Sequence, residues 1–96
     1  MPRVIWSREA TVALERIYHF LAVRDKGLAK RALSTIHDGA KLLEVQPLLG
    51  HPVAGGHAPS RELLVRFGRT GYLIRYVGEN DRVVIVSIRH SKQSAP

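Results

Sequence analysis

The sequence contains no cysteine and no long apolar run, and both absences limit what the chain can be. Without cysteine, a disulfide, a thiolate nucleophile and a zinc–cysteine site are all excluded. No apolar stretch approaches the length that spans a membrane, and the opening residues lack the apolar core of a signal peptide. We therefore expect a cytoplasmic protein without a membrane partner.

Acidic residues are also scarce. Eight Asp and Glu stand against fifteen Lys and Arg in 96 residues, which gives a formal net charge of +7. Such an excess favours an anionic partner, whether nucleic acid, a membrane surface or an acidic protein. The basic residues are spread along the chain without a run of like charges, so the sequence indicates a basic binding module without a nucleic-acid-binding tail.

The first half of the chain has the pattern of two helices. Apolar residues make up 45% of the sequence, enough for one folded domain over residues 1–96. A short strand is expected at 3–6, and Ser7 then caps a helix that runs to about residue 24. A second helix is expected at 28–45, and both helices carry apolar residues at three- and four-residue steps. Their short connection predicts an antiparallel helix hairpin.

Residues 47–60 have the composition of a loop. They include three prolines and three glycines and no Asp, Glu, Lys or Arg. His51 and His57 lie six residues apart in this segment with no acidic residue nearby. This is a weak pattern for a metal site, so we expect no metal and no other cofactor.

The second half of the chain predicts a sheet. Three strand-sized runs at 61–67, 72–78 and 82–90 are separated by Gly- and Asn/Asp-containing turns, which is typical of a three-stranded antiparallel meander. Side-chain alternation predicts one apolar face with Tyr72, Ile74 and Tyr76 and one mixed face. The mixed face is expected to carry apolar residues and arginines, namely Leu64, Arg66, Leu73, Arg75, Ile85 and Arg89. With the helix hairpin on the apolar face and the first strand added to the sheet, the fold class is α+β.

Six short segments, each weak alone, together resemble a known family. They are Ile5–Ala10, Leu14–Ile17, Leu42–Gly50, Arg61–Leu63, Tyr72–Tyr76 and Val84–His90. In this order they resemble the ParE/RelE superfamily, the toxin half of type II toxin–antitoxin modules, over nearly the whole chain. The similarity is greatest to the ParE branch, often described as plasmid stabilisation proteins. It implies a two-layer fold with the helices on one face of the sheet.

The resemblance also implies a function. ParE-like toxins are understood to bind and inhibit DNA gyrase without catalysis, and an acidic, ParD-like antitoxin encoded alongside neutralises them. We expect the antitoxin to bind the mixed face and to continue over the helix hairpin. Target binding is expected at Arg89, His90 and Lys92.

Two alternatives stay open. RelE-like members cut messenger RNA on the ribosome and need several cationic groups with an acid or base. Arg66, Arg89 and His90 would form that site here, although Leu64 and Leu73 stand where further basic groups are expected. The second alternative is a degenerate member of the fold without toxicity.

Overall fold

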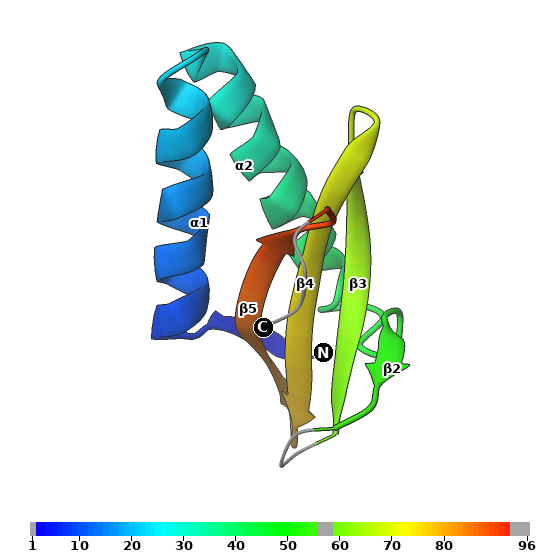
Figure 1. Cartoon of the computed structure of the whole chain (residues 1–96). Coiled ribbons are helices and arrows are strands. Elements are labelled where there is room, and N and C mark those ends of the chain that lie inside the picture. The colour runs from blue at the N-terminus through cyan, green and yellow to red at the C-terminus, as the bar shows by residue number, and fades with distance from the viewer. Residues whose placement is uncertain (1, 56–58, 93–96) are drawn as a thin grey trace.

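The computed structural model describes residues 2–55 and 59–92, and two helices cover one face of a five-stranded sheet (Figure 1). The sheet order is β1-β5-β4-β3-β2. The predicted α+β class, helix hairpin and C-terminal meander are confirmed. The elements in chain order are β1 (Arg3–Trp6), α1 (Arg8–Ala22), α2 (Lys26–Leu42), β2 (His51–Val53), β3 (Ser60–Phe67), β4 (Thr70–Glu79) and β5 (Arg82–His90).

The two outer strands differ from a simple meander. β1 pairs in parallel with residues 82–85 of β5, so the sheet is mixed. β2 pairs antiparallel with β3, which corrects the prediction of a loop throughout residues 47–60. This edge strand has three residues and contains Pro52, whose missing N–H is tolerated at a sheet edge. So short a run carries no periodic signal, which explains why the sequence did not predict it.

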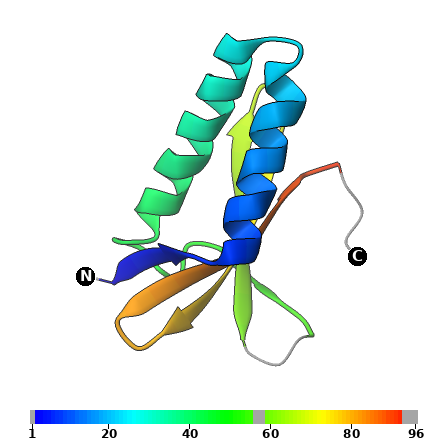
Figure 2. The same ribbon diagram turned by 90° about the vertical axis from the view of Figure 1, so that its left-hand side faces the viewer.

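Side-chain caps determine where the helices begin. The side chain of Ser7 accepts a hydrogen bond from the Ala10 N–H at 3.1 Å, and that of Asp25 accepts one from the Leu28 N–H at 3.1 Å. Because Asp25 caps it, α2 begins earlier than predicted, and it ends at Leu42, before the predicted end near residue 45. The two helices run side by side in front of the sheet (Figure 2).

The core lies between the helices and one face of the sheet. Tyr72, Ile74 and Tyr76 are buried there, as the alternation predicts. Gly39 allows α2 to approach the sheet, because a Cβ at this position would lie 2.5 Å from Cγ2 of Val65 in β3. The close contact that this glycine permits therefore joins a helix and a strand.

A β-bulge in β5 reverses the predicted orientation of the first half of that strand. Tyr76 pairs with Ile85, but the preceding Arg75 pairs with Ser87, which leaves Val86 as an extra residue. Ile85 consequently faces the helices and is fully buried, with 0% exposure. The prediction that Ile85 lies on the mixed face is therefore wrong.

Candidate partner-binding surface

The sheet face that points away from the helices is called the open face here. Among the central strands it includes Glu62, Leu64, Arg66, Leu73, Arg75, Val77, Ser87 and Arg89. Three guanidinium groups and one carboxylate give this set a formal charge of 3 − 1 = +2. The structure thus brings together five of the six residues predicted to bind the antitoxin, all except Ile85.

One carboxylate on the open face holds two arginines. Oε2 of Glu62 lies 3.1 Å from Nη2 of Arg75, and Oε1 lies 3.5 Å from Nη2 of Arg89, which reaches across the middle strand. The Glu62 side chain is only 17% exposed. Because each arginine uses a different carboxylate oxygen, Glu62 fixes the positions of both guanidinium groups.

The sequence contains a signal for the Glu62 pairing that the prediction of the mixed face did not use. Phe67 and Thr70 flank a two-residue turn and lie opposite each other. Glu62 is five residues before Phe67 and Arg75 is five residues after Thr70, so these two residues also lie opposite each other. Opposite charges at such cross-strand positions stabilise a sheet. In the free chain the Arg75 side chain is 35% exposed and that of Arg89 is 23% exposed. The reach of Arg89 across β4 to Glu62 accounts for this difference.

Apolar side chains lie between these charges. Leu64 and Leu73 stand directly opposite each other on β3 and β4, and Leu64 is 43% exposed. Nε of Arg75 is buried and has no hydrogen-bond partner among the described residues. The open face therefore combines accessible apolar area with guanidinium groups. Such a surface suits a segment that carries both apolar and acidic side chains.

His90 points to the helix side of the sheet. Its ring stands edge-on to that of Tyr72 with 5.4 Å between centroids, and burial raises the pKa of the Tyr72 hydroxyl. Nδ1 of His90 accepts a hydrogen bond from the Lys92 N–H at 3.2 Å. Nε2 lies 3.0 Å from the Thr70 hydroxyl oxygen and donates to it when His90 is neutral, because Nδ1 is then the unprotonated nitrogen. His90 and Lys92 are thus neighbours through a backbone contact.

The residues of the alternative ribonuclease site lie on two faces. Arg66 and Arg89 belong to the open face, whereas His90 belongs to the helix side. RNA cleavage needs the cationic groups and the acid or base around one phosphate and its neighbouring hydroxyl. The sheet separates Arg89 from His90, so these three side chains do not surround one point.

The Pro-x-x-Gly segment at 47–50 is held to the sheet by two side chains. The Tyr76 hydroxyl donates to the Pro47 carbonyl at 2.8 Å and accepts from the Gly50 N–H at 2.8 Å. Arg61 donates to the carbonyls of Leu48 and Gly50 at 3.2 and 2.7 Å. A Cβ at Gly50 would collide with the β3 backbone at 2.8 Å, so only glycine fits. This attachment connects the end of α2 firmly to β2.

Other kinds of site have little support in residues 2–55 and 59–92. No group of three His, Cys, Asp or Glu in these residues could hold a metal ion, and His57 lies outside them. No helix there is long and apolar enough to cross a membrane.

The fold and the open face define a small α+β domain with a basic, partly apolar sheet surface. A family profile described as "ParE toxin of type II toxin-antitoxin system, parDE" matches residues 4–95, so the chain belongs to the ParE toxin family. Its structure is similar to a chain of the "Chromosomal ParDE TA system from P. aeruginosa", with a TM-score of 0.76 and 21% identity over 96% of this chain and 98% of that one. No curated protein matches the sequence. The predicted family and fold are confirmed, and membership of such a module implies an antitoxin partner.

Proposed function

We propose that this toxin acts in the cytoplasm by binding and inhibiting DNA gyrase, and that a cognate antitoxin neutralises it. Membership of the ParE family supports the toxin role. The separation of Arg89 and His90 onto opposite faces of the sheet carries the argument for binding over catalysis. A ribonuclease would need both groups near one phosphate. Arg89, His90 and Lys92, at the end of β5, stay our proposed target contacts.

The test of the target uses purified toxin with gyrase and relaxed plasmid DNA. We expect supercoiling to stop and linear plasmid to accumulate after detergent and protease treatment, because the toxin traps gyrase on broken DNA. Antitoxin mixed with the toxin beforehand should abolish both effects. In parallel, messenger RNA on translating ribosomes should stay intact. Codon-specific cuts that the His90→Ala variant fails to make would identify a ribonuclease instead, and inactivity in both assays would indicate a degenerate member.

We further propose that the antitoxin binds the open face. An acidic segment that is disordered when free gives up conformational entropy on binding, so it needs a long contact and charge complementarity. The open face offers both, through Leu64 and Leu73 and through the arginines beside them. Carboxylates of the antitoxin are then expected near Arg66, Arg75 and Arg89, with Glu62 keeping the latter two in position.

An affinity series tests this surface. Arg75→Ala should weaken antitoxin binding by about 2–5 kcal/mol, the usual cost of removing one partner of a desolvated charge pair. Arg66→Ala, on the exposed part of the face, should cost less. The exposed Lys30 on α2 provides the control, because its substitution by Ala should change affinity by well under about 1 kcal/mol. Equal losses for all three variants, or none for any, would show that another surface binds the antitoxin.

A further inference from the structure

The pairing of β2 with β3 places His51 on the open face. Residues that stand directly opposite each other in an antiparallel pair project to the same side of the sheet, with their Cβ atoms about 5 Å apart. His51 stands opposite Glu62, and Glu62 stands opposite Arg75. These three side chains therefore form a row across three neighbouring strands, which Figure 1 shows side by side.

The backbone that leads into His51 is anchored. The Gly50 N–H donates to the Tyr76 hydroxyl at 2.8 Å, and the Gly50 carbonyl accepts from Arg61 at 2.7 Å. These two hydrogen bonds fix the residue before His51, whereas His51 itself is exposed. A partner on the open face would therefore meet the imidazole at a position that the fold determines.

Glu62 is the charged group that faces His51 across the strand pair. Its carboxylate already holds Arg75 and Arg89, at 3.1 and 3.5 Å. Arg61, the neighbour of Glu62 on β3, donates instead to the carbonyls of Leu48 and Gly50. Residues 47–55, the segment that contains β2, include no Lys, Arg, Asp or Glu. His51 is thus the residue of this segment through which the charge of the open face can change.

The charge of a histidine changes between about pH 8 and 5. Protonation of His51 would place a third cation beside the cluster of Glu62, Arg75 and Arg89. The formal charge of the open face would then rise from +2 to +3. An acidic partner favours the protonated imidazole, so its binding takes up a proton and becomes tighter as the pH falls.

We propose that His51 contacts the acidic segment of the antitoxin, so that the binding surface extends from the central strands onto β2 and the affinity depends on pH. The inference rests on the proposed function, because it takes the antitoxin as the partner. Val53 lies two residues further on β2 and projects to the same side, which adds apolar area beside the ring. β2 thus repeats the combination of apolar and cationic side chains that the central strands offer.

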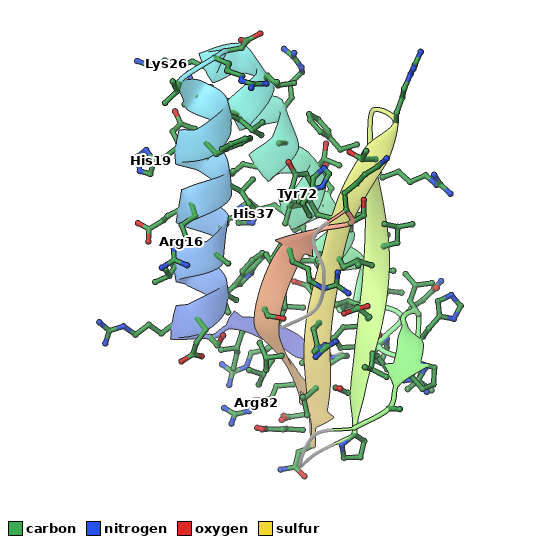
Figure 3. All side chains as sticks on the ribbon, in the orientation of Figure 1. Arg16, His19, Lys26, His37, Tyr72 and Arg82 are labelled. Atoms are coloured by element: carbon green, nitrogen blue, oxygen red, sulfur yellow. The ribbon has the colours of Figure 1, made fainter. Side chains whose placement is uncertain are left out.

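Calorimetric titration of the full chain with the purified antitoxin encoded beside it, at about pH 7.5 and 5.5, tests the contact. The wild type should bind more tightly at the lower pH. His51→Gln should remove about twofold to fivefold of this gain, the effect of one partly exposed charge pair. His51→Lys carries a permanent charge and should bind more tightly than His51→Gln already at the higher pH. His19→Gln is the matched control, because His19 is also exposed and projects from α1 away from the sheet (Figure 3).

Three results would overturn the contact. If His51→Gln keeps the full pH response of the wild type, or if His19→Gln removes as much of it, His51 does not touch the antitoxin. If His51→Lys binds no more tightly than His51→Gln at the higher pH, the partner does not recognise a charge at this position. In these cases a loss of affinity in Arg75→Ala would leave the proposed function intact. If the wild-type chain does not bind the antitoxin at either pH, the proposed function fails as well. Circular dichroism at both pH values verifies that each variant is folded.

Discussion

Replacing Tyr76 by Phe should destabilise the fold, although the aromatic ring is kept. Tyr76 is 1% exposed, and its hydroxyl connects the Pro47 carbonyl to the Gly50 N–H, both at 2.8 Å. The substitution removes one oxygen atom and breaks both hydrogen bonds. Water cannot easily replace it, because Gly50 is buried against β3.

The expected loss follows from these two bonds. A buried N–H left without an acceptor costs about 1–3 kcal/mol, and the second hydrogen bond contributes about 0.5–1.5 kcal/mol. Together they predict a decrease of about 2–4 kcal/mol in the free energy of unfolding. The free energy of unfolding of small domains is about 5–15 kcal/mol, so the Tyr76→Phe variant should still fold. It should unfold at a clearly lower denaturant concentration than the wild type.

Urea unfolding followed by circular dichroism measures this loss. The midpoint should fall while the slope of the unfolding free energy stays unchanged, because the same surface is exposed on unfolding. Tyr72→Phe is the control: Tyr72 is also buried, but its hydroxyl connects no such pair of backbone groups in the described part of the chain. Equal midpoints for the two variants would refute the importance assigned to the Tyr76 hydroxyl.

Two further predictions concern stability. Gly39→Ala should cost about 1–3 kcal/mol, because its new Cβ would lie 2.5 Å from Val65 Cγ2. When Val65→Ala is added, the double variant should be more stable than the sum of the two single losses predicts. If urea unfolding shows that the two losses in unfolding free energy simply add, the close contact between positions 39 and 65 would be contradicted. Burial raises the pKa of Tyr72 above its ordinary value of 10.0, so the unfolded chain loses this proton first. The wild type should therefore lose stability relative to Tyr72→Phe as the pH rises above about 10, and parallel pH profiles would contradict this.

The sequence predicted the helices and central strands because each shows a clear period or a clear boundary. The three- and four-residue spacing located both helices and Ser7 marked the first turn of α1, whereas the cap at Asp25 was not predicted. Alternation correctly placed Tyr72 and Tyr76 in the core. The parallel pairing of β1 was not visible in the sequence, because strand direction depends on where the helix hairpin returns the chain.

The error at Ile85 has a local cause. Residues 83–86 are apolar at every position, so they show no alternation that would indicate which side chains face the core. The bulge at Val86 shifts the alternation by one residue, and such a shift moves side chains to the other face. Ser87 and Arg89 lie beyond the bulge, opposite Arg75 and Leu73, and both are on the predicted face.

The Glu62 pairings change how the open face would recognise an acidic partner. In the free chain two guanidinium groups share one carboxylate, so this cluster keeps a net positive charge. A partner carboxylate that joins the cluster neutralises it without displacing Glu62, and desolvation then strengthens each contact. Breaking the partly exposed Arg75–Glu62 pair in the free chain should cost no more than about 1 kcal/mol. We therefore expect Arg75 to matter more for antitoxin affinity than for folding, and measuring both quantities on one Arg75→Ala sample separates the two roles.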